Sequence, residues 1–451
     1  MKRLTKKGVS VLLAVIMLTG GFNFLSAFAA DAGIILAGEC GAEGDTVNFA
    51  IYNDGRLVIS GEGKIKDYAF ASPISLLWIT PPRPQNFVTK LIISEGITEI
   101  GDYAFTDCYS LETMILPDSL TYIGRQAFLR TAWYEKYPDG MIYLGKCAYI
   151  YKGIILKDTV VTIKDGTISI SSEAFYWNPY TWNNINGLKE VNIPESVKKI
   201  GDDAFYYCES LVSFNVAEKN PNYSSADGVL YDKQKEILIH YPAGNSAASF
   251  TVSAGVKEIR SRAFERCYNL TELMISEGVI SIGKNAFYNC HFLKSVTLPD
   301  SLESIGESAF FRCYDLEYIT IPDKVKTIEY STFEGCSSLK YIIIPNSITF
   351  LDEFAFNRNI MLCGSPGSYA EEYATKYDRR FAAVLPDWKT GDVDGDGEIT
   401  AADARLALRA SSRLTTLSNE GVWAADINKD GSIDTSEARK ILRVSSRLDA
   451  F

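Results

Sequence analysis

Oxygen-bearing side chains at alternate positions mark a twelve-residue segment that begins at Asp392. They stand at positions 1, 3, 5, 7 and 12 of the segment: Asp392, Asp394, Asp396, Glu398 and Asp403. Gly397 at position 6 permits the sharp turn that such a loop needs, and Glu398 would contribute its backbone carbonyl. Hard oxygen donors at this spacing are the ligands that Ca²⁺ prefers, so the segment predicts a calcium loop.

The same pattern recurs further along the chain, with every position shifted by 34. Its ligand positions are occupied by Asp426, Asn428, Asp430, Ser432 and Glu437. The helices predicted after the loops repeat as well, since Arg405 and Arg409 correspond to Arg439 and Arg443. A single acidic loop also occurs without an ion, but two loops with matching helices predict two bound Ca²⁺ ions.

The order of loop and helix differs from that of an ordinary EF-hand, which has a helix before each loop. Pro386 and Gly391 leave no room for such a helix before Asp392. A loop followed by a helix, duplicated within residues 391–451, resembles a type I-like dockerin domain. The resemblance implies calcium-dependent binding to a cohesin module of a scaffoldin, the assembly principle of cellulosomes.

The resemblance also implies which residues contact the cohesin, namely loop positions ten and eleven and the helix behind them. These residues are Ala401, Ala402, Arg405, Arg409, Thr435, Ser436, Arg439, Lys440 and Arg443. One loop pair is apolar and the other carries hydroxyls, so the two halves are not equivalent. The basic residues equally fit an ordinary solvated helix face.

Charge favours coupled folding and metal binding in this segment. Residues 391–451 hold 11 acidic and 8 basic residues, a net charge of −3, which two Ca²⁺ ions would change to +1. Without metal the clustered carboxylates repel one another, so we expect metal binding and folding to be coupled.

A recurring phrase dominates the chain before these loops. Ile-Gly-x-x-Ala-Phe-x-x-Cys-x-x-Leu-x-x-apolar-x-apolar-Pro describes most copies. Its marker phenylalanines are Phe264, Phe287, Phe310, Phe333 and Phe356 at equal spacings of 23, with less even copies at Phe70, Phe105, Phe128, Phe175 and Phe205. This period lies in the range of leucine-rich repeats.

Each copy predicts one coil of a stacked structure. In the copy after Phe287, Leu293, Val296 and Leu298 point inward from a short strand that Pro299 ends. One coil cannot bury its apolar face alone. Stacked coils can, and their strands then pair about 4.8 Å apart.

The Phe, Cys and Pro of the phrase recur together and at the same positions within each repeat. The segment 67–384 therefore resembles the BspA-type leucine-rich repeats of secreted bacterial surface proteins. The resemblance implies an α/β repeat fold, a leucine-rich-repeat solenoid with β-hairpin insertions, followed by the small all-α dockerin. We expect an N-terminal β cap at 30–66, hairpins at 141–146 and 228–242, and a closing cap helix with Ser368 as N-cap. A linker would span 385–390.

Six of the nine cysteines follow a marker Phe by three residues: Cys108, Cys208, Cys267, Cys290, Cys313 and Cys336. This regularity favours a buried column of small apolar thiols over a disulfide framework. A disulfide between neighbouring coils stays open, because the compartment is predicted to be extracellular. Cys40, Cys147 and Cys363 fall outside the pattern and are not assigned.

Extended repeat surfaces more often bind proteins than hold catalytic pockets. Tyr318 and Tyr341 share an outward column and would serve as ligand anchors or as cross-strand packing. Trp177 and Trp182 lie in an insertion and would stack on sugar rings or plug a hydrophobic loop. The ligand is therefore a protein or a cell-wall polysaccharide.

Targeting is predicted from the N-terminal segment 1–29. A basic start, an apolar run from Val9 to Leu18 and the small-x-small pattern Ala27-Phe28-Ala29 are typical of a secretory signal peptide. No later stretch is long and apolar enough to span a bilayer. The chain is accordingly expected outside the cell, bound to a cell-surface cellulosome.

Composition narrows the function. The 451-residue chain has a formal charge of −11, which argues against a nucleic-acid partner, and its two His residues leave little for Ser/His or Cys/His catalysis. Repeats, caps, insertions and dockerin leave no stretch large enough for a catalytic domain. We predict a non-catalytic adaptor without catalytic residues. The alternatives are a polysaccharide-degrading or esterase-type enzyme and a carbohydrate-binding module.

Overall fold

The computed structural model describes most of the repeats and parts of the C-terminal domain. The described residues are 33–69, 86–176, 187–383, 390–394, 398–412, 414–415, 417, 424–427 and 433–448. The predicted signal peptide, Phe70, Trp177 and Trp182 lie outside them. The chain forms two compact units. None of the described helices is long and apolar enough to cross a membrane.

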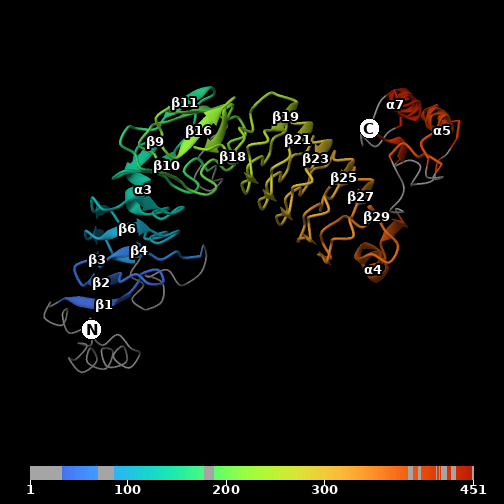
Figure 1. The fold of residues 1–451 in the computed structure, drawn as a ribbon. Coiled ribbons are helices and arrows are strands. Elements are labelled where there is room, and N and C mark those ends of the chain that lie inside the picture. Colours follow the sequence, from blue (N-terminus) through green and yellow to red (C-terminus); the bar gives the residue numbers. More distant parts are fainter. Residues whose placement is uncertain are drawn as a thin grey trace. The chain divides into compact units, whose positions relative to one another are not determined.

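The first unit begins with three antiparallel strands that continue into the parallel strands of the coils (Figure 1). This sheet consists of β1 (Ile34–Glu39), β2 (Asn48–Tyr52), β3 (Arg56–Ser60), β5 (Lys90–Ile93) and β7 (Thr113–Ile115). A second, parallel sheet consists of β4 (Gly63–Ile65), β6 (Ile97–Ile100) and β8 (Tyr122–Ile123). Buried Ile51, Ile59, Leu91 and Phe105 contribute to the core of this unit.

An insertion interrupts the coils after Phe128. The short helix α3 (Ala132–Lys136) begins at Thr131, whose hydroxyl accepts a hydrogen bond from the backbone N–H of Tyr134. The antiparallel hairpin of β9 (Gly140–Leu144) and β10 (Cys147–Lys152) follows. Its strand β10 pairs in parallel with β12 (Ser169–Ile170), which in turn pairs in parallel with β14 (Lys199–Ile200). The hairpin expected around residues 141–146 is therefore present.

The second unit also opens with an insertion. Its first sheet is parallel and holds β11 (Thr159–Thr162), β13 (Leu188–Ile193) and β15 (Ser213–Val216). A meander of β16 (Tyr223–Ala226), β17 (Val229–Asp232) and β18 (Ile237–His240) follows, and its last two strands form the second expected hairpin. From β18 the same sheet continues in parallel through β20 (Glu258–Ile259), β22 (Ser281–Ile282) and β24 (Ser304–Ile305).

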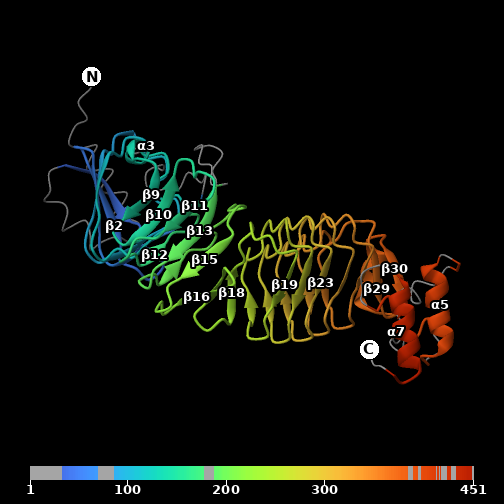
Figure 2. The same ribbon diagram turned by 90° about the horizontal axis from the view of Figure 1, so that it is seen from above.

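The regular coils also contribute strands to two further parallel sheets, and Figure 2 shows these strands following one another along the stack. One sheet holds β19 (Ser249–Val252), β21 (Glu272–Ile275) and β23 (Ser295–Thr297), and the other holds β25 (Tyr318–Thr320), β27 (Tyr341–Ile343), β29 (Met361–Gly364) and β30 (Arg380–Ala383). On the other side of the last coils, β26 (Thr327–Ile328) pairs with β28 (Phe350–Leu351). Partners such as Leu273 and Val296 stand exactly one repeat apart in the sequence, so the register equals the repeat length.

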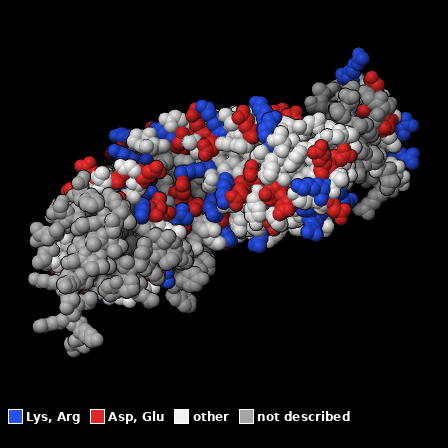
Figure 3. All heavy atoms as spheres, turned by 90° about the horizontal axis from the view of Figure 1, so that it is seen from below, with Lys and Arg blue, Asp and Glu red and all other residues white. Residues whose placement is uncertain are grey.

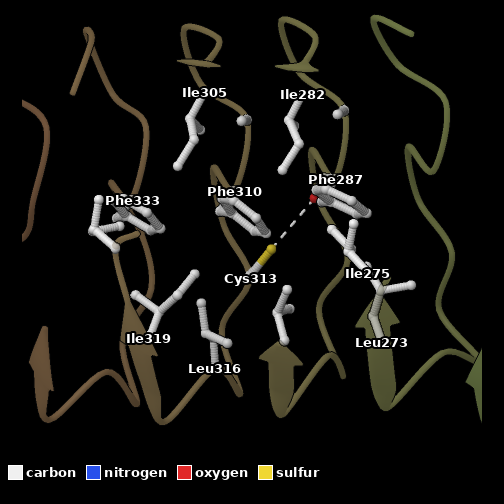
Figure 4. Packing of buried hydrophobic residues seen from close by; sticks show 14 of the residues in the cluster. Leu273, Ile275, Ile282, Phe287, Ile305, Phe310, Cys313, Leu316, Ile319 and Phe333 are labelled. Atoms are coloured by element: carbon white, nitrogen blue, oxygen red, sulfur yellow. Dashed lines mark hydrogen bonds between the residues drawn. The ribbon is translucent and has the colours of Figure 1, made fainter. Parts of the chain in front are cut away.

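The marker phenylalanines form a stack through the core, as Figure 4 shows. The ring of Phe310 lies 4.9 Å from that of Phe287 and 5.3 Å from that of Phe333, and all three side chains are fully buried. Gly306 belongs to the Ile-Gly part of the phrase. A Cβ at this position would lie 2.5 Å from the backbone nitrogen of Lys284, so close packing of adjacent coils requires glycine there.

All nine cysteines are buried and free, which confirms the thiol column and not a disulfide framework. The column also bonds between coils. The Cys290 thiol donates to the carbonyl of Phe264 (2.9 Å), and Cys313 donates to that of Phe287 (3.3 Å; Figure 4). Thiols are weak donors, and each of these carbonyls also accepts a backbone N–H of its own turn, so the thiol adds a second hydrogen bond that joins neighbouring coils.

The closing helix α4 (Tyr369–Lys376) covers the last coil and buries Ala370, Tyr373 and Ala374. Ser368 occupies the N-cap position with extended backbone, but its hydroxyl makes no capping hydrogen bond. The expected N-cap position is therefore confirmed, without the side-chain hydrogen bond that serine usually makes there. Instead, Glu371 Oε2 accepts a hydrogen bond from the backbone N–H of Gly367 at 2.6 Å.

Candidate metal centre and partner-binding helices

Two helices of equal length carry the C-terminal candidate site, α5 (Ala401–Ser411) and α7 (Thr435–Ser445) (Figure 1). They pack through small apolar side chains, among them Ala404, Ala407 and Ala438, together with Ile441. The backbone N–H of Gly391, before the first loop, donates to the carbonyl of Ala424, before the second, at 2.8 Å. The two loop-helix motifs therefore form one small core.

Three of the predicted ligands meet in the first loop. Carboxylate oxygens of Asp392, Asp394 and Asp403 all lie within 4.8 Å of one another. Asp392 and Asp403 are buried, whereas Asp394 is exposed. Glu398 is exposed, which suits a residue expected to bind through its carbonyl, and Asp396 lies outside the described residues.

Asp403 is fixed in place by the start of α5. Its Oδ1 accepts from the backbone N–H of Val393 (2.6 Å) and of Asp394 (3.2 Å). Its Oδ2 accepts from the backbone N–H and the hydroxyl of Thr400, at 2.8 and 3.2 Å. Thr400 is the N-cap, and the two residues form a capping box. The last ligand position thus orients the loop and begins the helix.

The second loop repeats this arrangement. Glu437 Oε1 accepts from the N–H of Ile427 at 2.6 Å, and its Oε2 accepts from the N–H of Asp434, the N-cap of α7, at 3.0 Å. Asp426 and Glu437 are buried, as their counterparts Asp392 and Asp403 are. Asn428, Asp430 and Ser432 lie outside the described residues.

The donor set fits a divalent cation. Four carboxylates of the two loops are buried in a domain of small apolar residues, where an ionised carboxylate is costly unless it is neutralised or coordinates a metal. All the predicted side-chain ligands are oxygen donors, which Ca²⁺ prefers and soft transition metals do not. Asp392, Asp394 and Asp403 would hold one ion, which would cancel their mutual repulsion; Asp426 and Glu437 would help to hold the other.

The two N-caps differ, which adds to the difference between the halves. The N-cap is Thr400 in the first half and Asp434 in the second. Asp434 Oδ1 accepts from the hydroxyl of Ser436 at 2.6 Å and from the backbone N–H of Ser436 and Glu437. The hydroxyl hydrogen bond from Ser436 is the main cause that lowers the pKa of Asp434. Ser436, a predicted cohesin contact, therefore also donates to the N-cap residue of α7.

All predicted cohesin contacts are at least partly exposed on α5 and α7: Ala401, Ala402, Arg405, Arg409, Thr435, Ser436, Arg439, Lys440 and Arg443. The sequence reasoning missed two leucines beside them. Leu408 is 47% exposed and Leu442 is 46% exposed, and they occupy equivalent positions in the two halves. Each leucine lies beside an arginine that the resemblance assigns to the cohesin contact, namely Arg409 and Arg443, so both belong to the same candidate surface. The sequence did offer a signal for them, because Leu408 and Leu442 recur at the same 34-residue offset as the predicted contact residues.

The predicted repeat ligand surface is placed only in part. Tyr318 and Tyr341 are register partners on β25 and β27, and Tyr341 is half-buried. The side chain of Tyr318, like Trp177 and Trp182, lies outside the described features. On the face drawn in Figure 3, basic and acidic side chains are interspersed along the solenoid, and neither sign forms one continuous patch.

Comparison with known proteins agrees with this architecture. A model described as "BspA type Leucine rich repeat region" matches residues 64–176, 148–226 and 243–363 in six copies. A model described as "Dockerin type I domain" matches residues 390–443. No curated protein sequence matches the chain.

Similar solved structures come from bacteria. A leucine-rich repeat protein from Eubacterium ventriosum is 26% identical, with 70% of this chain and 84% of that chain covered and a TM-score of 0.45. A leucine rich cell surface protein from Faecalibacterium prausnitzii is 23% identical, with 76% and 98% covered and a TM-score of 0.44. By the family models, the chain belongs to the BspA-type leucine-rich-repeat proteins and carries a type I dockerin domain.

Proposed function

We propose that this protein is a secreted, non-catalytic adaptor of a cell-surface cellulosome. Its dockerin binds a cohesin module of a scaffoldin when two Ca²⁺ ions are bound, and its repeats bind a protein or a cell-wall polysaccharide. The observation that carries the proposal is the pair of loop-helix motifs with buried carboxylates at matching positions. Neither matched family is catalytic, which supports the adaptor role.

The proposed metal acts through the shape of the two helices. Buried Asp403 and Glu437 connect each loop to the first turn of α5 or α7. Bound Ca²⁺ would neutralise the loops, so that the helices can pack and present their exposed faces. The cohesin would then contact Arg405, Leu408 and Arg409 on one helix and their counterparts on the other. Gathering proteins on one scaffold raises their effective concentration, so repeats that bind their ligand with low affinity would suffice for targeting.

The direct test is a titration of the full chain against a panel of cohesin modules, in Ca²⁺ and after chelation with EDTA. We expect binding to one or more cohesins in Ca²⁺, loss of binding in EDTA and recovery when Ca²⁺ is restored. Binding that persists unchanged in EDTA would contradict the metal-dependent mechanism. A parallel assay for sugar release from cell-wall polysaccharides tests the enzymatic alternative, since release of soluble sugar would favour a hydrolase.

The exposed helix faces allow a second, more local test. Leu408→Ala and Leu442→Ala remove equally exposed side chains from α5 and α7 and should leave calcium binding unchanged. If the cohesin uses one orientation, one substitution should weaken binding far more than the other. Leu414→Ala, at a leucine that is 70% exposed beyond the end of α5, is the matched control.

A further inference from the structure

The last coil of the solenoid borders a cavity of about 350 Å³ that neither the metal loops nor the dockerin helices use. Its lining includes Glu334, Glu353, Phe354, Asn357, Arg358 and Arg379. The volume is within the range of small-molecule sites, and the lining combines aromatic rings with charged and amide groups. Such a combination is typical of a binding site for a polar ring.

The cavity arises where the stack of coils ends. In earlier coils the turn after the marker Phe is covered by the next coil, as when the N–H of Phe310 donates to the carbonyl of Thr332 and that of Arg312 donates to the carbonyl of Glu334. Phe356 is the last marker in the sequence, and α4 follows it in place of a further coil. The ring of Tyr373 on α4 meets that of Phe356 edge-on at 6.4 Å. A single helix does not reproduce the shape of a coil, and the space beside it remains open.

Phe354 is an aromatic residue at a position where the repeat does not need one. The equivalent residues of the three preceding coils, at steps of 23, are Asn285, Ser308 and Ser331, all polar and buried. Phe354 is instead 53% exposed, and the half-exposed ring of Tyr330 meets it edge-on at 5.8 Å. The end of the stack therefore presents two exposed aromatic rings, although burying them would be favourable.

The polar walls of the cavity are held in place. Arg379 Nη2 donates to the backbone carbonyl of Glu353 at 3.1 Å. The hydroxyl of Tyr373 donates to the carbonyl of the preceding residue, Asp352, at 3.0 Å, and the Asn357 side chain accepts from the N–H of Gly335, also at 3.0 Å. These bonds fix the segment 352–358 before any ligand arrives, which lowers the entropy cost of binding.

From this arrangement we infer that the cavity binds a neutral sugar ring of a polysaccharide, with Phe354 as the stacking surface. A sugar ring has apolar C–H faces that suit an aromatic ring, and hydroxyls that both donate and accept. Glu334 and Glu353 supply acceptors, and Arg358 and Arg379 supply donors. Two carboxylates balance two guanidinium groups, so the lining does not favour an anion. The inference rests on the proposed function and names the ligand class of the repeats.

The experiment titrates the full chain in Ca²⁺ with neutral hexasaccharides of glucose, xylose and mannose, and with an oligogalacturonate as the acidic probe. Phe354→Ala removes the stacking surface, and Phe292→Ala is the matched control because it removes a phenylalanine that is 51% exposed in another coil. We expect binding to at least one neutral sugar, a loss of about tenfold or more in Phe354→Ala, and little change in Phe292→Ala.

Three results would overturn the inference: no binding of any neutral sugar, equal weakening by the two substitutions, or tighter binding of the acidic probe. A protein ligand found on a peptide array and lost in Phe354→Ala, without sugar binding, would also count against it. Cohesin binding measured on the same samples separates the two proposals. If the unaltered chain binds a cohesin but no sugar, only the sugar site is refuted. If the unaltered chain binds no cohesin, the adaptor role is refuted. Thermal melts show whether each variant is folded.

Discussion

Replacing Asp403 with asparagine removes one negative charge from the first loop with almost no change in volume. Each oxygen of Asp403 accepts two hydrogen bonds, from Val393 and Asp394 on one side and twice from Thr400 on the other. The amide nitrogen of asparagine cannot accept, so when it faces Thr400 the bond from the Thr400 N–H is lost, the hydroxyl bond has to reverse, and the remaining bonds lose their charged acceptor. One lost bond to a charged acceptor costs about 1.5 kcal/mol, and weakening the two bonds from Val393 and Asp394 to neutral ones costs roughly another 1.5 kcal/mol, about 3 kcal/mol together. Because folding and metal binding of this domain are expected to be coupled, the loss would appear as an affinity for Ca²⁺ reduced on the order of 100-fold.

Isothermal titration of the full chain with Ca²⁺ measures this effect directly. We expect two binding steps for the unaltered chain, and one of them weakened by about two orders of magnitude in Asp403→Asn. Asp300→Asn, at an exposed turn of the solenoid, controls for the change in charge and should leave both steps unchanged. If Asp403→Asn binds two ions with unaltered affinity, the buried carboxylate is not a ligand and the reasoning about the loop is wrong.

Three further predictions concern the rest of the chain. Phe310→Ala should lower the free energy of unfolding of the repeats by about 3–5 kcal/mol, because its buried ring is stacked on both sides, whereas Phe292→Ala should change it little; denaturant unfolding followed by circular dichroism checks both. Burial lowers the pKa of His240 to about 4, so between about pH 6.5 and 4 the unfolded state binds more protons than the folded state. The free energy of unfolding should therefore fall as the pH falls through this window. Denaturant melts of His240→Gln should show a smaller fall. Burial raises the pKa of the Cys40 thiol to about 12, and all nine thiols are buried, so a thiol reagent at pH 8 should react slowly with the folded chain and quickly in guanidinium; fast titration of the native thiols would contradict this.

The repeats were readable from the sequence because burial in a coil is local and periodic. Once in every repeat the same position meets the same neighbours, and spacing alone places Phe287 against Phe310. The calcium loops were readable for a related reason, since ligand spacing within one short loop fixes which oxygens can meet. Asp392, Asp394 and Asp403 do meet, although the occupancy of the loops stays a prediction.

Other features depend on geometry that the spacing does not encode. Ser308 and Ser331 adopt left-handed backbone, with φ of 56° and 53°, at turns where the residue type does not signal it. Ser368 is an N-cap whose hydroxyl makes no capping hydrogen bond, which the residue type does not signal. The exposure of Leu408 and the cavity beside Phe354 depend on which elements pack nearby in three dimensions, and the spacing of residues along the sequence does not encode this.

The equality of strand register and repeat length makes the length of the regular stack adjustable in steps. Each regular coil contacts only the coil before and the coil after it, through partners such as Leu273 and Val296. Inserting or deleting one whole coil would lengthen or shorten this stack by about 4.8 Å and leave every surviving interface intact. Any other length change would place an aromatic ring opposite the wrong neighbour. Gene duplication in units of one coil can therefore tune how far apart the first and last regular coils stand, without redesigning the interior.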